Sequence, residues 1–138
     1  MLAQLTYVSD RNSNCTDEEI KKILSVAEKY NPLLKITGVL LYTDTKFIQM
    51  LEGDAKLISG LYTKIKLDKR HCNFWMISFG PIDKKSFPSW HMGARKIEGS
   101  LVDFKSDISK EDEIIFNNML NGKEESGAKV LNLLKMFF

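Results

Sequence analysis

The sequence predicts an α+β domain with the ferredoxin-like element order β-α-β-β-α-β-β, followed by two C-terminal helices. Strand-length apolar segments alternate with segments whose apolar residues recur at helical spacing. Their order is the split βαβ pattern, which places both intervening helices on one face of the sheet. The length of 138 residues, with 43% hydrophobic and 28% charged residues, is ordinary for a single globular domain.

Five segments have the composition of strands. They are expected at residues 2–8, 39–43, 47–52 and 74–79, with a short last strand at 92–96. Asp44-Thr45-Lys46 is typical of a hairpin turn between the second and third strands.

Two helices are predicted between the strands. The first has Thr16 as N-cap, Glu19 as the answering acid of a capping box, and Pro32 to end it. The second begins after Asp54 and ends near Asp68. The residues expected to face the sheet are Ile20, Ile23, Leu24 and Ala27 in the first helix, and Ile58, Leu61, Tyr62 and Ile65 in the second.

The other face of the sheet is expected to be covered by the C-terminal segment. That face carries Thr6, Val8, Ile48 and Met50, which is too apolar to leave in water. One helix should begin at Ser109 with Asp112, ending before Gly122, and another should run from about Ser126 to Phe137. The inward residues are expected to be Ile114, Ile115, Met119 and Leu120, then Val130, Leu131, Leu134 and Phe137.

Composition excludes several functional classes. The net charge is only +2, and the basic residues are spread without the stripe typical of nucleic-acid binding. Apolar segments are strand-length and the N-terminus has no signal-like core, so we expect no membrane partner and a cytoplasmic location. Two cysteines and two histidines offer no zinc-site spacing, and no glycine-rich phosphate loop occurs. Cys72 and His71 are adjacent in a strand and should point to opposite faces, which excludes a nucleophile and base pair.

Three polar side chains fall where the pattern predicts a core. Gln49 lies in the run 47–51, whose two alternating faces are both apolar, and Tyr7 shares a strand face with apolar neighbours. Asn31 falls near the centre of the buried stripe of the first helix, which should bring it close to the other two. Taken singly, they also fit a core phenol, an amide bonded to a backbone carbonyl, and a helix C-cap.

Five motifs containing these residues carry a family resemblance. In order, they are Tyr7-Val8-Ser9, Asn31-Pro32 with Ile36-Thr37-Gly38, Phe47-Ile48-Gln49-Met50-Leu51-Glu52-Gly53, Asp68-Lys69-Arg70-His71, and Phe87-Pro88-Ser89-Trp90-His91-Met92. Together they resemble the BLUF family of blue-light sensors that use flavin, over roughly residues 1–97. The resemblance implies a flavin-binding photosensor domain at 1–97 and, at 98–138, the helical extension of short members.

The resemblance also implies a cofactor and its binding residues. The cofactor would be non-covalent FAD, with FMN or riboflavin as alternatives. Asn31 would hold the imide edge of the ring, Arg70 would reach the other carbonyl while held by Asp68, and Lys64 stands where some members have an arginine near the ribityl chain. The implied cofactor-binding residues are Tyr7, Ile23, Leu24, Asn31, Gln49, Lys64, Asp68, Arg70 and His71.

The implied mechanism is photochemical and needs no catalytic residue, so the chain is expected not to be an enzyme. The photoactive residues would be Tyr7, Gln49, Trp90 and Met92. Tyr7 would give an electron and a proton, and Gln49, by rotation or tautomerisation, would then donate to a flavin carbonyl and shift absorption to the red. Trp90 also fits a core anchor.

Two other functions and the output stay open at this stage. The alternatives are a flavin-free ferredoxin-like interaction module and a flavin oxidoreductase, for which His91 is the only candidate acid or base. Family resemblance favours a homo-oligomer and a downstream protein partner, and the apolar chain end at 133–138 is typical of an interface.

Overall fold

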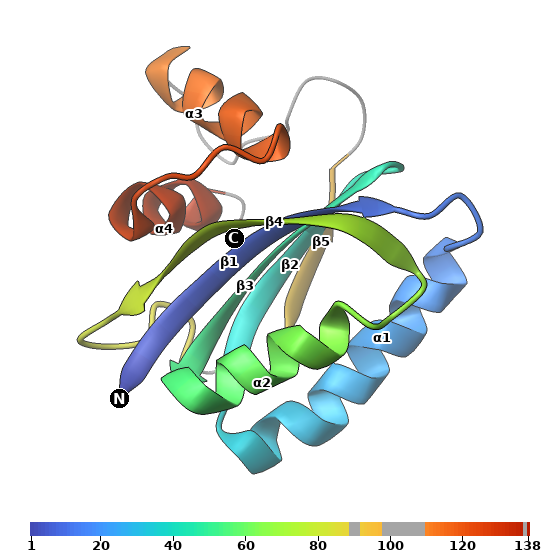
Figure 1. The fold of residues 1–138 in the computed structure, drawn as a ribbon, viewed down its shortest axis with the longest axis horizontal. Coiled ribbons are helices and arrows are strands. Elements are labelled where there is room, and N and C mark those ends of the chain that lie inside the picture. Colours follow the sequence, from blue (N-terminus) through green and yellow to red (C-terminus); the bar gives the residue numbers. More distant parts are fainter. Residues whose placement is uncertain (89–91, 98–109, 137) are drawn as a thin grey trace.

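A computed structural model describes residues 1–88, 92–97, 110–136 and 138 (Figure 1). Four residues with a predicted role therefore lie outside the described residues: Trp90, His91, Ser109 and Phe137. The elements are β1 (Leu2–Arg11), α1 (Asp17–Tyr30), the 3₁₀ turn η1 (Asn31–Leu34), β2 (Thr37–Tyr42), β3 (Lys46–Asp54), α2 (Ala55–Ile65), β4 (His71–Pro81), β5 (Gly93–Lys96), α3 (Lys110–Leu120) and α4 (Gly127–Lys135).

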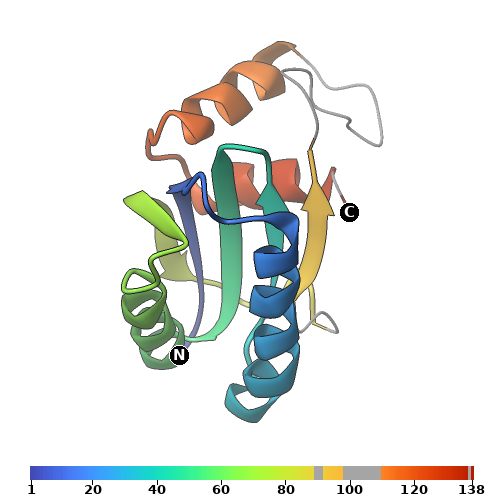
Figure 2. The ribbon, with the colours of Figure 1, turned by 90° about the vertical axis from the view of Figure 1, so that its right-hand side faces the viewer.

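The strands form one sheet in the order β4-β1-β3-β2-β5, antiparallel throughout except for β5, which runs parallel to β2. Helices α1 and α2 lie on one face of the sheet, whereas α3 and α4 lie on the other (Figures 1 and 2). This confirms the predicted ferredoxin-like α+β fold with an added strand. We call the α1 and α2 side the front face and the α3 and α4 side the back face.

Capping side chains fix where the helices begin. The hydroxyl of Thr16 accepts from the backbone N–H of Glu19, as the capping box predicts, and Asp54 accepts from Lys56 and Leu57 at the start of α2. Helix α2 ends at Ile65, three residues before the predicted end. Residues 66–68 instead form a turn whose N–H groups bond to carbonyls of the last helical turn.

Each face of the sheet carries its own apolar core. The back core joins Val8, Ile48 and Met50 of the sheet to α3 and α4, as predicted. The buried residues that the two helices contribute are Phe116, Met119, Val130, Leu133 and Leu134. The prediction was wrong for Ile114, which is 53% exposed, because the buried side of α3 is the one that carries Phe116 and Met119. The tail thus covers the sheet of its own chain, and Gly122 ends α3 in the left-handed conformation with φ of 81°.

The register between β1 and β3 decides which polar groups meet. Tyr7 lies directly opposite Gln49, and both side chains point to the front face. Gly38 of β2 lies opposite Leu51, and a Cβ at this position would clash with the carbonyl oxygen of Met50. Glycine therefore lets β2 approach the strand that carries Gln49.

Strands β1 and β4 are longer than predicted, because they pair beyond their apolar centres. Their register shifts between Thr6 and Tyr7 and again between Val8 and Asp10, and Asn73 has a φ of 52° near the second shift. Asp10 is held there by Lys46 at 2.5 Å and by Asn73 at 2.8 Å. Such polar strand ends are stabilised by residues distant in the sequence, and they lack the alternating apolar pattern from which a strand is predicted.

Candidate functional site

A pocket opens on the front face between α1 and α2. Its empty volume is about 770 Å³, counting the part open to solvent. It is lined by Tyr7, Ile23, Val26, Ala27, Tyr30, Asn31, Leu40, Phe47, Gln49, Leu61, Ile65, Asp68, Arg70 and His71. On its α1 wall, Val26 is 55% exposed and Tyr30 is 50% exposed, so large apolar side chains line the opening of the pocket.

Two residues that line the pocket, Tyr7 and Gln49, are bonded to each other, and Gln49 also bonds to Met92, which is not part of the lining. The hydroxyl of Tyr7 donates a short hydrogen bond to Oε1 of Gln49, and Nε2 of Gln49 donates to Sδ of Met92 at 3.4 Å. All three residues are buried. The buried amide thus has a donor on its oxygen and a weak acceptor on its nitrogen, as its burial requires.

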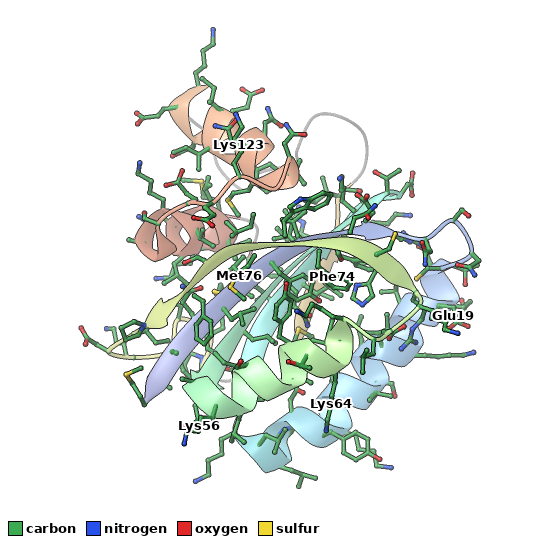
Figure 3. All side chains as sticks on the ribbon, in the orientation of Figure 1. Glu19, Lys56, Lys64, Phe74, Met76 and Lys123 are labelled. Carbon is green, nitrogen blue, oxygen red and sulfur yellow. The ribbon has the colours of Figure 1, made fainter. Side chains whose placement is uncertain are left out.

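Two aromatic rings pack around the ring of Tyr7. The ring centroids of Tyr62 and Phe74 lie 5.1 and 5.6 Å from that of Tyr7. Figure 3 shows Phe74 extending from β4 towards α2. Burial in this apolar setting raises the pKa of Tyr7 well above its ordinary value, and Tyr62 and Asp68 add to the rise. The phenol is therefore protonated, and its proton faces Oε1 of Gln49.

His71 is a neutral buried base beside this cluster. Its Nε2 lies 3.1 Å from the carbonyl oxygen of Ile65, which only accepts, so Nε2 carries the proton. Its Nδ1 lies 3.1 Å from the hydroxyl of Ser9, which donates to it. Burial lowers the pKa of His71, and the opposing influence of Asp68 is smaller. Cys72 points elsewhere and donates to Asn12 at 3.3 Å, so the adjacent pair does not meet, as predicted.

A charged cluster lies at one rim of the pocket. Arg70 donates from Nη2 to Asp68 at 2.5 Å, and a second Arg70 nitrogen, Nη1, lies 3.7 Å from Glu19 at the start of α1. Figure 3 shows Glu19 at that end of α1. The hydrogen bonds from Arg70 hold the pKa of Asp68 below its usual range. The guanidinium is thereby fixed at the pocket rim, as predicted for a group held by Asp68.

Asn31 is both a helix cap and a pocket residue. Its backbone N–H bonds to the carbonyl of Ala27 as the C-cap of α1, and its own carbonyl accepts from Ile36 at 3.0 Å. The side chain is buried and lines the pocket with Tyr7 and Gln49. The C-cap interpretation and the predicted proximity to the other two polar groups are therefore both correct.

Two predicted cofactor contacts lie away from the pocket wall. Leu24 packs against the front core, and Lys64 is exposed on α2, from which Figure 3 shows it extending in the direction of α1. Neither residue lines the pocket. Ile23 does, together with residues that the sequence reasoning missed: Val26, Ala27, Tyr30, Leu40, Phe47, Leu61 and Ile65.

The pocket-lining residues of α1 could have been predicted from their spacing in the sequence. Ile23, Val26, Ala27 and Tyr30 have the spacing i, i+3, i+4, i+7, which is a second apolar stripe beside the one centred on Ile20. A helix with a stripe wider than its contact with the sheet has apolar surface left for a ligand.

The described part of the chain offers few other chemical sites. It contains no cluster of histidine, cysteine and acidic residues able to hold a metal ion. Across residues 1–88, 92–97, 110–136 and 138, no helix is long and apolar enough to cross a membrane.

Comparisons with known proteins agree with this geometry. A family model described as sensors of blue-light using FAD matches residues 2–93. The photoactivated adenylate cyclase subunit beta of Euglena longa is 34% identical over 88 residues, which are 64% of this chain and 10% of that protein. This chain thus spans about a tenth of the length of the curated relatives it matches.

Solved structures show the same fold. The photo-activated state of BlsA is 28% identical with a TM-score of 0.75, covering 99% of this chain and 94% of that one. The dark state of the BLUF protein BlrB is 32% identical with a TM-score of 0.67, covering 69% of this chain and 72% of that one.

The buried neutral His71 predicts a pH dependence of stability. Since burial depresses its pKa below the value of about 6.5 in an unfolded chain, the unfolded state takes up the extra proton first. The stability that depends on neutral His71 is therefore complete above about pH 7 and falls as the pH drops below about 6.5, by at most about 1.4 kcal/mol per pH unit. Urea unfolding of the wild type and of His71→Gln should give diverging profiles between about pH 7 and 5. Since His91 is present in both proteins, its contribution cancels, and parallel profiles would contradict this assignment.

Proposed function

We propose that this chain, which belongs to the BLUF family of blue-light sensors that use FAD, senses light through the hydrogen-bonded pair Tyr7 and Gln49. The observation that carries the proposal is the bond from Tyr7 to Gln49 in an apolar pocket between α1 and α2. The family match favours a photoreceptor over a flavin-free interaction module or a flavin oxidoreductase.

The residues of the pocket fit a flavin ring. Its apolar walls on α1 and α2 suit a flat ring, and the Asn31 amide can answer a donor and an acceptor side by side, as the imide edge of the ring presents them. Arg70, fixed by Asp68, supplies a cation at the rim. We propose FAD as the physiological form, following the family description, with FMN or riboflavin as alternatives.

When bound, the flavin supplies light absorption and an oxidising excited state. Tyr7 is then the donor of an electron and a proton. Burial makes a tyrosinate costly at this position, so the phenol keeps its proton until it has lost an electron; the oxidised phenol would then release that proton along its existing bond to Oε1 of Gln49. Tyr7 is buried, with Tyr62 and Phe74 packed against its ring, so its bond to Gln49 would be the route for the proton.

Gln49 is the element with two hydrogen-bond patterns. If its amide turns over, Nε2 faces the Tyr7 oxygen and Oε1 faces the sulfur of Met92. A thioether sulfur accepts weakly and has no proton to donate, so the turned amide loses its contact with Met92. The arrangement seen here is favoured in the dark for that reason, and tautomerisation of the amide would change the same two contacts.

Signalling is proposed to pass to other protein molecules. In a matched relative, the corresponding region is about a tenth of a protein named as a subunit of a photoactivated adenylate cyclase. We propose that this chain self-associates and acts on a protein partner, with no catalytic step of its own.

A first prediction is that the purified protein holds a non-covalent flavin and that blue light shifts its visible bands reversibly to longer wavelength. The physical reason is that Gln49 acquires a new hydrogen bond to the ring when its amide rearranges. Spectra in the dark, after illumination and during recovery test the shift, and chromatography of the released pigment separates FAD, FMN and riboflavin. A flavin-loaded protein with no light-induced shift would refute the photosensory role.

A second prediction separates photochemistry from binding. Tyr7→Phe and Gln49→Leu should each keep flavin and lose the persistent red shift, because one lacks the proton donor and the other lacks the two-sided amide. Asn31→Ala should instead weaken flavin binding about tenfold, the size of one hydrogen bond. Titration with FAD and difference spectra measure both effects.

The matched control for that series is Tyr62→Phe. It keeps an aromatic ring 5.1 Å from Tyr7 and removes only a neighbouring hydroxyl, so the red shift should persist. A normal, slowly recovering red-shifted state in Tyr7→Phe would show that the assigned mechanism does not operate in this chain.

A third prediction concerns the oligomer. Sedimentation of the full chain should detect self-association whose extent differs between dark and illuminated samples. Gln49→Leu is the control, because it lacks the proposed photochemistry and should sediment identically in both. A monomer in both conditions would leave the output to a different protein partner.

A further inference from the structure

Glu52 is a fully buried carboxylate on the strand that carries Gln49. It lies three residues after Gln49 in β3, is 0% exposed, and points to the back face of the sheet. Its Oε2 accepts from the backbone N–H of Ser86 at 2.7 Å, and its Oε1 accepts from that of Phe87 at 2.8 Å. Each oxygen is therefore matched to one donor on the loop between β4 and β5.

These two hydrogen bonds offset the cost of burying the carboxylate of Glu52. Within the described residues, no lysine, arginine or histidine forms a salt bridge with Glu52. Hydrogen bonds to an ionised acceptor are roughly twice as strong as neutral ones, and a buried carboxylate without them is costly. The loop backbone at Ser86 and Phe87 is therefore tied firmly to β3.

The tied loop joins two parts of the molecule. Along the chain it leads to Met92, whose sulfur accepts from Gln49 at 3.4 Å. In space, the ring of Phe87 is in the back core with α4, and it meets the ring of Phe138 edge-on with centroids 5.9 Å apart. Figure 2 shows α4 behind the sheet, on the side opposite α1. The hydrogen bonds of Glu52 thus attach to β3 a loop that contacts Gln49 through Met92 and the chain end through Phe87.

We propose that Glu52 is a positioning residue that couples the state of Gln49 to the C-terminal helix, by holding the loop that presents Met92 on one side and Phe87 on the other. The inference rests on the proposed function, because it assumes that light changes the contact between Gln49 and Met92. A change in that contact alters the position of Met92 relative to Ser86 and Phe87, which are bonded to β3, and Phe87 conveys the change to α4 through the back core. Without the bonds to Glu52, Phe87 is no longer held in place on β3 and α4 does not respond.

The test uses Glu52→Gln in the full chain. The variant keeps shape and one acceptor, but places an NH₂ against a backbone N–H, so one of the two bonds is lost. Amide hydrogen exchange of Ser86 and Phe87 in the dark, flavin-free protein should accelerate about tenfold, the equivalent of about 1.4 kcal/mol. This readout does not depend on photochemistry.

The loaded protein gives the second readout. Glu52→Gln should keep the red shift, recover about tenfold more slowly in the dark because the arrangement with Met92 against Gln49 is less favoured, and lose the light-induced change in amide exchange across residues 127–136. Wild type with no red shift would refute the proposed function. Wild type with a red shift and a light response in α4 that Glu52→Gln preserves would refute the coupling by Glu52.

Matched controls separate coupling from loss of stability. Thr37 lies opposite Glu52 in β2, and its buried hydroxyl has no hydrogen-bond partner among the described residues, so Thr37→Val removes a polar atom beside Glu52 and should leave the response intact. Ser86→Ala keeps the backbone donor and should do the same. If Glu52→Gln fails to fold, Phe87→Leu keeps both bonds to Glu52 but removes the ring contact with Phe138, and it should lose the response of α4. An unchanged response in Phe87→Leu would refute the proposed path.

Discussion

The antiparallel register of β1 against β3 is the constraint on which the site depends. It sets Tyr7 opposite Gln49 on the front face, and a shift of one residue would turn one of the two side chains to the back face. The register is fixed by apolar side chains on both faces, with Leu5 and Leu51 in the front core and Val8 and Ile48 in the back core. The apolar residues on both faces therefore fix the strand register, and the register places Tyr7 opposite Gln49.

The fold was predictable to the extent that its signals are local. Capping residues and apolar spacing located every helix start that the structure describes at Thr16, Asp54 and Ser126, and the order of elements gave the sheet. The polar ends of β1 and β4 were not predictable, because Asp10 and its neighbours join the sheet through bulges and a cation on β3. Nothing in their own sequence distinguishes these residues from a loop.

The site shows a similar division. The Tyr7 and Gln49 contact followed from two polar residues in apolar strands, and the Asp68 and Arg70 pair followed from a family motif. The tautomer of His71 did not, since it depends on Ser9 and the carbonyl of Ile65, which lie 62 and 6 residues away in the chain. Lys64 is exposed on α2 and does not line the pocket, so its proposed contact with a ribityl chain stays a prediction.

Strand β3 has the geometry needed to connect the two faces. Its residues alternate, so Gln49 faces the pocket, while Met50 and Glu52 face the helices behind the sheet. A rigid strand in the centre of a sheet transmits little by bending, and a signal that depended on its movement would have to disturb both cores. The connection from β4 to β5 avoids this difficulty, because its residues Ser86 and Phe87 bond to Glu52 on the back of β3 and its residue Met92 bonds to Gln49 on the front. A change of one hydrogen bond at Gln49 is therefore transmitted more easily around the edge of the sheet than through it.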